Sequence, residues 1–353
     1  MSSLGDCQSS IVPSTREVEL LVSVIGDRVG VYPTYYNPSI EAYDRGHRPM
    51  LRVSVDSFDV TDRTRVSIRV FPPTRAWKLT DMVRLGSIDA KLAAYLWLAL
   101  EVGVPVLVIG PRALGRRVCR RPDVRVAPPS TVIAKVEDID EVLLPPQELV
   151  SDYAGSVIPL LSREGHGGAG VRPIPLFQRL VHALRVGADY IFVNEVRGGP
   201  EDTRAWLHAI MSGQVGGATT MHAGGVEEAI VRLREYGVPI DLVRLLVVLM
   251  GRFEVGGRVV RRVVGAWVVD GGKPLVAWDG GALHEDVLVK FLGGRVGEDF
   301  VIREVGDREA FLRHYSGFDI DETEWVRLIA LFHRARDLVM PRDVKSDVVF
   351  DES

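Results

Sequence analysis

The chain has 353 residues, of which 46% are hydrophobic and 25% charged, and its formal net charge is −4. This length suggests two or three domains, and the composition is ordinary for a globular protein. The weakly acidic balance gives no reason to expect nucleic acid as a partner. Only Cys7 and Cys119 are present, which excludes a disulfide framework or a four-cysteine zinc site.

No targeting or membrane segment is expected. The first ten residues lack the charged and apolar regions of a signal peptide. The longest apolar stretch, residues 92–110, is interrupted by Glu101, Gly103 and Pro105, so it reads as helix, turn and strand instead of a membrane span. The simplest location is therefore the cytoplasm.

Residues 1–72 are expected to form a small β-rich domain. Segments 16–33, 50–60 and 63–71 are rich in β-branched residues and are separated by turn-forming residues, which predicts strands. The run Phe71-Pro72-Pro73-Thr74 ends this pattern, and residues 73–80 read as a linker.

The larger domain is expected over residues 81–340, followed by a polar tail over 341–353. It opens with a helix that Thr80 would cap and Gly103 would end. Apolar strands then alternate with helices, which predicts an α/β fold with a mostly parallel sheet. The expected strands are 104–110, 130–138, 188–196 and 216–223, and the expected helices are 176–187, 200–213 and 225–237. Further strands over 254–272 and 273–281 and a helix over 321–338 complete the domain.

Four short motifs follow or end these strands, where parallel sheets bind ligands. The first, GPRALGRR at 110–117, has the glycine spacing of a phosphate-binding P-loop but not its final Lys and Ser or Thr. The others are KVED at 135–138, DYIFVNEVR at 189–197 and TTMH at 219–222. Each also has an ordinary interpretation: a chance glycine match, a solvated turn or helix cap, or a structural histidine. Their order and their placement together favour function.

The order of these motifs resembles the secretion ATPases, the motors of type II and type IV secretion and of type IV pilus and archaellum assembly. Residues 187–233 resemble the Walker B and histidine-box region of that family, and residues 132–146 its acidic box. The likeness covers about residues 65–265 and is closest to the archaeal branch. It implies a RecA-like P-loop NTPase core joined to the N-terminal domain, with ATP and Mg²⁺ bound between the domains in a ring of six.

The resemblance also implies roles for individual residues. Glu195 would be the Walker B carboxylate that holds Mg²⁺ through water, Glu137 the candidate general base and His222 the histidine-box sensor. The remaining nucleotide-binding candidates are Gly110, Gly115, Arg116, Arg117 and Asp138, with Arg69 and Arg197 as arginines that face phosphate. The implied partners are five further subunits in a homomeric or mixed ring, an active ATPase paralogue and a polytopic membrane platform protein. The chain would then lie against the cytoplasmic face of the membrane.

The sequence departs from the family at its P-loop. Arg116 stands where the compact lysine should be, and Arg117 offers no lone pair to magnesium where a hydroxyl is needed. Pro122 ends the following helix within two turns, and residues 112–121 contain five arginines.

Three functions remain open from these observations. The first is a degenerate subunit with impaired or absent ATP hydrolysis, which the loop chemistry favours. The second is an active hexameric motor with an atypical P-loop. The third is a protein-binding or polyanion-binding module that uses the Arg112–Arg121 cluster.

Overall fold

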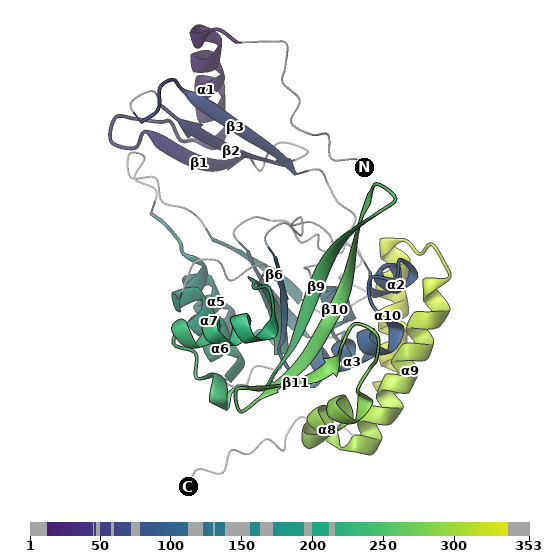
Figure 1. Ribbon diagram of the computed structural model, residues 1–353. Coiled ribbons are helices and arrows are strands. Elements are labelled where there is room, and N and C mark those ends of the chain that lie inside the picture. Colours follow the sequence, from purple (N-terminus) through teal and green to yellow (C-terminus); the bar gives the residue numbers. More distant parts are fainter. Residues whose placement is uncertain are drawn as a thin grey trace. The chain divides into compact units, whose positions relative to one another are not determined.

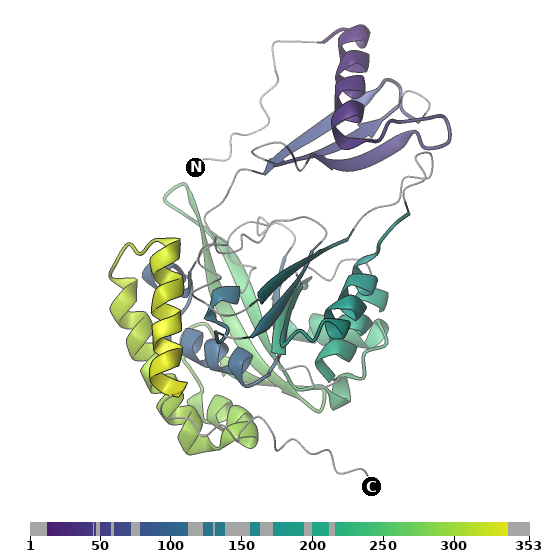
Figure 2. The same ribbon diagram turned by 180° about the vertical axis from the view of Figure 1, so that it is seen from behind.

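The computed structural model describes residues 13–44, 46, 50–57, 60–71, 78–111, 123–129, 131–137, 156–162, 172–193, 200–211 and 216–337. These residues fall into two compact units. The first contains a three-stranded antiparallel sheet and one helix, and the second contains an eight-stranded sheet with helices on both faces (Figures 1 and 2).

The N-terminal unit packs a helix on a small sheet. Its elements are α1 (Thr15–Val29), β1 (Ser39–Asp44), β2 (Met50–Asp56) and β3 (Arg65–Phe71), with strand order β1-β2-β3. The strands at β2 and β3 were predicted, and β1 was not. A small core joins the helix to the sheet; it includes Val22, Ile25, Val29, Ile40, Val53 and Val55.

The expected strand over residues 16–33 is wrong, because this segment forms α1. Ser14 caps the helix, and the Glu17 carboxylate accepts the N–H of Ser14 at 2.7 Å in a reciprocal capping box. Gly30 ends the helix with φ of 74°, a left-handed conformation that glycine adopts readily. The many valines favour a strand by propensity. Their 3.6-residue spacing and the caps at both ends favour a helix, and the helix forms.

The second unit begins with two helices in place of the single predicted one. These are α2 (Leu79–Arg84) and α3 (Ala90–Glu101). Thr80 lies inside α2 and is not its cap, since Lys78 precedes the helix. Gly86, with φ of 63°, breaks the helical run, and the Asp89 carboxylate starts α3 by accepting the N–H groups of Lys91 and Leu92.

The eight-stranded sheet confirms the α/β class. Its order is β11-β10-β9-β4-β8-β7-β5-β6. Strand pairs β4–β9, β4–β8, β7–β8 and β5–β7 are parallel, whereas β9, β10 and β11 form an antiparallel extension. The strands are β4 (Val106–Gly110), β5 (Val132–Glu137), β6 (Ser156–Leu161), β7 (Tyr190–Val193), β8 (Gly216–His222), β9 (Leu245–Val255), β10 (Arg258–Asp270) and β11 (Lys273–Trp278).

Helices cover both faces of this sheet. On one face lie α2, α3, α8 (Glu285–Val296), α9 (Glu298–Ser316) and α10 (Glu322–Asp337); on the other lie the second half of α5 (Leu176–Arg185), α6 (Pro200–Met211) and α7 (Val226–Glu235) (Figure 1). Short 3₁₀ turns occur at η2 (Val124–Val126) and η4 (Ile240–Leu242). The main core lies between the sheet and α3, α9 and α10, and it includes the fully buried Trp97 and Trp325.

Candidate functional site

The carboxyl ends of four neighbouring parallel strands form one edge of the large sheet. Strands β4, β8, β7 and β5 lie side by side in that order. Their last residues include Gly110 on β4, His222 on β8 and Glu137 on β5. Gly110 and His222 are Cα partners in the register. Ligands of open parallel sheets bind at this edge, so we take it as the candidate site.

Three predicted site residues therefore meet at this edge: Gly110, Glu137 and His222. Arg69 belongs to the other unit, where it lies on β3 as the register partner of Arg52. Six further candidates lie outside the described residues: Gly115, Arg116, Arg117, Asp138, Glu195 and Arg197.

The strand register decides which of these side chains share a face. Lys135 on β5 is level with Phe192 on β7, which in turn is level with Ala218 on β8. Residues two apart on a strand point to the same face. Glu137 and Thr220 therefore lie on the face that carries Lys135, one step nearer the carboxyl edge.

A buried ion pair lies on this face. The Lys135 ammonium nitrogen Nζ is 3.1 Å from Oε2 of Glu137, and the two side chains are 1% and 0% exposed. The sequence motif contained both residues, but Lys135 was given no role. Opposite charges two residues apart in an apolar strand are the signal for such a pair, because that spacing places both side chains on one face.

Strand β5 is fixed to β7 at its amino end. The Asp189 carboxylate accepts the N–H of Val132 at 2.7 Å, and the N–H of Asp189 donates to the carbonyl oxygen of Val132 at 2.7 Å. This two-way contact fixes the register of β5, and with it the level of Lys135 and Glu137.

The loop after His222 is fixed by α7. The N–H of Gly224 donates to Oε2 of Glu228 at 2.6 Å, and Arg232 donates to Oε1 of the same carboxylate at 2.6 Å. The Gly224 N–H, with a smaller contribution from Arg232, holds the pKa of Glu228 below its usual value. The first turn of α7 thus uses its own carboxylate to hold the end of β8.

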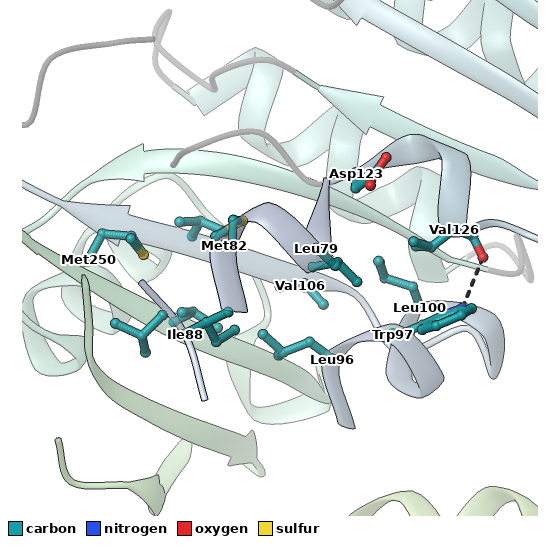
Figure 3. A pocket seen from close by; sticks show the side chains of 13 residues that line it. Leu79, Met82, Ile88, Leu96, Trp97, Leu100, Val106, Asp123, Val126 and Met250 are labelled. Carbon is teal, nitrogen blue, oxygen red and sulfur yellow. Dashed lines mark hydrogen bonds between the residues drawn. The ribbon is translucent and has the colours of Figure 1, made fainter. Parts of the chain in front are cut away.

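An apolar cavity of about 70 Å³ lies on the core side of β4 (Figure 3). Its one charged lining residue among those described is Asp123, and Trp97 beside it donates its indole N–H to the carbonyl oxygen of Val126 at 3.0 Å. The rest of the described lining is Leu79, Met82, Ile88, Leu96, Leu100, Val106, Val108, Val126, Val248, Met250 and Val263. Such walls cannot solvate a phosphate, so the cavity is not a phosphate site.

No group of three or more His, Cys, Asp or Glu side chains that could hold a metal ion occurs within the part of the chain that the structure describes. A magnesium site at this edge would need oxygen ligands. The described carboxylate at this edge, Glu137, lies 3.1 Å from the Lys135 ammonium.

The family model described as "Type II/IV secretion system protein" matches residues 47–253. Among curated proteins, "Uncharacterized protein MJ1287" of Methanocaldococcus jannaschii is 32% identical over 187 residues, which cover 52% of this chain and 65% of that protein. "Uncharacterized protein MJ0900" of the same organism is 29% identical over 271 residues, which cover 72% of this chain and 45% of that protein. The matched part of the chain thus spans about two thirds or less of the length of each of these relatives.

Two solved structures are similar at low identity. The Legionella pneumophila ATPase DotB is 19% identical with a TM-score of 0.49, covering 93% of this chain and 86% of that one. The VirB11 ATPase from the Brucella suis type IV secretion system, in complex with sulphate, is 18% identical with a TM-score of 0.37, covering 72% of this chain and 84% of that one.

Proposed function

Because the chain belongs to the type II/IV secretion system protein family, we propose that it is a secretion-ATPase subunit with impaired or absent ATP hydrolysis. It would act beside an active subunit in a type II/IV secretion, pilus or archaellum assembly complex. Residues 1–72 would be its N-terminal domain and residues 81–340 its motor domain.

The first support for this proposal is the P-loop sequence. Arg116 replaces a lysine that acts as a compact point charge against phosphate, and its planar guanidinium cannot take that position unchanged. Arg117 replaces the hydroxyl that would hold Mg²⁺.

The observation that carries the proposal is the Lys135–Glu137 ion pair. A general base must reach a water molecule with its carboxylate oxygen in a free direction. Oε2 of Glu137 lies 3.1 Å from an ammonium, and the side chain is fully buried. The carboxylate is thus engaged by lysine at the position where the family places its acidic box. Phosphoryl transfer needs a positioned water and correctly placed cations, and this arrangement supports neither in its usual form.

The proposed assembly follows the family. We propose a ring of six that is homomeric or mixed, bound to a polytopic membrane platform protein at the cytoplasmic face. Such an association would be peripheral. None of the helices in the described ranges combines the length and the apolar character that a membrane crossing requires.

The test is phosphate release from Mg-ATP by the purified chain, compared with its Glu195→Gln variant. We expect equal rates, since the chain's own hydrolysis should not exceed the background of that variant. A wild-type rate at least about tenfold higher would instead identify an active motor with an atypical P-loop.

A second measurement separates the proposal from the polyanion-binding module. The chain should co-purify with an intact family member when the two are co-expressed. Charge reversal across residues 112–121 should leave that association in place. Loss of the association together with salt-sensitive polyanion binding would favour the binding module.

A further inference from the structure

We propose that residues 346–353 of this chain bind along the outer edge of strand β10, where β10 forms the end of its hairpin with β9. The stretch of β10 concerned is residues 258–262, which we call the basic edge. The bound segment would cover this edge, and its release would open the edge to a strand of another molecule. The contact is separate from the proposed function.

The hairpin of β9 and β10 extends beyond the rest of the sheet (Figure 1). Strand β4 pairs with β9 over residues 246–249, whereas β9 and β10 stay paired up to the turn at Gly256 and Gly257. On its other side, β10 pairs with β11 from Ala266 onward. A two-stranded ribbon is at best marginally stable in water by itself. The end of the hairpin would therefore be stabilised by a further strand.

The end of the hairpin exposes apolar side chains on both of its faces. Phe253 and Val255 lie on one face and are 45% and 58% exposed. Val259 is level with Glu254, so it lies on the opposite face, and it is 38% exposed. Exposed apolar side chains that gather on one element mark an interaction site. A segment that binds here needs apolar side chains of its own.

The basic edge also presents backbone groups to a further strand. The N–H of Val263 points away from β9, because it donates to the carbonyl oxygen of Ser87 at 2.8 Å. Backbone groups two residues apart on an antiparallel strand point to the same side, so the N–H of Val259 faces the same outer edge. In the described part of the chain, no strand pairs with β10 on this side at the level of Val259.

A segment of the same chain matches the basic edge in charge and in apolar pattern. The basic edge reads RVVRR, with two valines between arginines. Residues 346–353 read SDVVFDES, with three apolar residues between acidic ones and no basic residue. On neighbouring strands, opposite charges form stabilising cross-strand pairs, and so do β-branched and aromatic side chains. The segment can therefore place its apolar residues beside the valines and its carboxylates beside the arginines.

The segment starts from the layer of helices that flanks the base of the hairpin. Helix α10 ends at Asp337, and Arg336 holds this end on α9 by donating to Oδ2 of Asp307 at 2.8 Å. Helix α9 packs against α2, and Ser87, between α2 and α3, holds β10 at Val263. The eight residues between α10 and the segment can span up to about 26–29 Å when extended. The segment is therefore long enough to approach the basic edge of its own chain.

The first test is binding of a fluorescent synthetic peptide of residues 345–353 to the full chain. Val348→Ser combined with Phe350→Ser should release the chain's own segment, because it removes the apolar side chains that hold it. The peptide should bind this double variant with a Kd on the order of 10–100 µM and wild type at least about tenfold more weakly. Equal binding to both chains, or no binding to the double variant, would overturn the proposal.

Charge reversal tests the place of binding. The exposed Arg262 lies on the basic edge, and Arg262→Glu in the double variant should weaken peptide binding by at least about fivefold. Arg327→Glu is the matched control, because Arg327 is an exposed arginine on α10, and it should leave binding unchanged. Equal losses from the two reversals would show attraction to net charge instead of binding at the edge, and would overturn the proposal.

Hydrogen exchange tests the same contact without the peptide. The Val259 amide should exchange at least about tenfold faster in the double variant than in wild type, because it loses its acceptor on the segment. The Val263 amide, which donates to Ser87, should exchange equally in both and serves as the internal control. Dilution of wild type should change neither rate, because the contact lies within one chain. A Val259 amide that exchanges equally fast in both proteins, or faster on dilution, would overturn the proposal.

Discussion

Gly110 and His222 are Cα partners at the carboxyl ends of the neighbouring parallel strands β4 and β8. Gly110, which opens the glycine motif, and His222, which the family resemblance assigns to a histidine box, thus stand next to each other, although they are far apart in the sequence. The two strand ends that the resemblance assigns to a nucleotide site therefore lie at one edge of the sheet. The charge at this edge differs from the family pattern, and the strand placement and the charge can be tested separately.

Restoring the P-loop residues should restore magnesium-dependent binding before it restores turnover. Arg116→Lys with Arg117→Thr returns the compact ammonium and the hydroxyl ligand to the loop. We expect the affinity for Mg-ATP to rise by about tenfold while phosphate release stays near background, because Glu137 remains engaged by Lys135. Titration calorimetry and a phosphate-release assay on the same preparation measure the two effects. Equal gains in affinity and turnover would show that the loop alone limits hydrolysis.

Removing the Asp189 carboxylate should loosen β5. The Val132 N–H would lose its acceptor, which costs about 1–2 kcal/mol for a partly buried group. Asp189→Ala should therefore unfold at a lower urea concentration than wild type, whereas Asp189→Asn keeps an acceptor oxygen and should lose less. Hydrogen exchange of β5 amides would show whether the effect is local. If both variants match wild type, the contact does not hold the strand.

A methyl group at Gly217 should not be tolerated. A Cβ at this position of β8 would overlap the backbone carbonyl of Ile191 on β7, and backbone cannot move aside cheaply. We expect Gly217→Ala to cost at least about 2 kcal/mol, comparable to overpacking elsewhere. Gly306→Ala in α9 is the matched control, because a Cβ there meets nothing within 4 Å, and it should stabilise the helix by about 0.5–1 kcal/mol. Urea unfolding of the two variants should shift in opposite directions.

The helices over the core should show acid-sensitive stability through Glu304. Burial alone would raise the pKa of this carboxyl, but hydrogen bonds from Arg336 and Arg308, at 2.8 Å and 2.6 Å, outweigh burial and lower the pKa. A lowered folded-state pKa stabilises the fold above the unfolded value of about 4.5, and this contribution is lost as the pH falls through the folded value.

Glu304→Gln should accordingly destabilise the protein by about 2–3 kcal/mol near neutral pH, and the difference from wild type should shrink below about pH 4.5. Glu309→Gln is the control, since its Arg313 partner is mostly exposed and the pair should contribute less than about 0.5 kcal/mol. Urea midpoints measured between about pH 7 and pH 3.5 would reveal the trend. A constant difference across that range would contradict the assignment.

Much of the fold follows from periodicity. The apolar runs at 106–110 and 132–137 and the helices α6, α7 and α10 lie where the sequence places them, because their periodic patterns agree with their turn and cap residues. The segment of helix α1 was predicted as a strand, since a valine-rich segment can fit both a strand pattern and a helix pattern. The Ser14–Glu17 capping box distinguishes the two in favour of the helix. The antiparallel extension at β9 was missed in part, because Leu245–Met250 is apolar on both faces and carries no alternation.

The family could be predicted from the order of its motifs, and the match over residues 47–253 confirms that prediction. The sequence predicted that Gly110 and His222 both lie at strand ends, but not that their strands are neighbours, since the order of strands in a sheet is not readable from local sequence patterns. The Lys135–Glu137 pair was missed, although the sequence carries a signal for it. Two opposite charges two residues apart in one apolar strand point to the same face, where they can pair.

We propose that the Lys135–Glu137 pair, and not the P-loop alone, withholds the carboxylate from catalysis. The decisive comparison is of Mg-ATP phosphate release by the Arg116→Lys/Arg117→Thr variant and by the same variant carrying Lys135→Met. We predict that removing the ammonium raises the rate by at least about tenfold and that Glu137→Gln abolishes the gain. Equal rates with and without Lys135, in proteins that bind nucleotide equally, would show that the ion pair does not restrain Glu137.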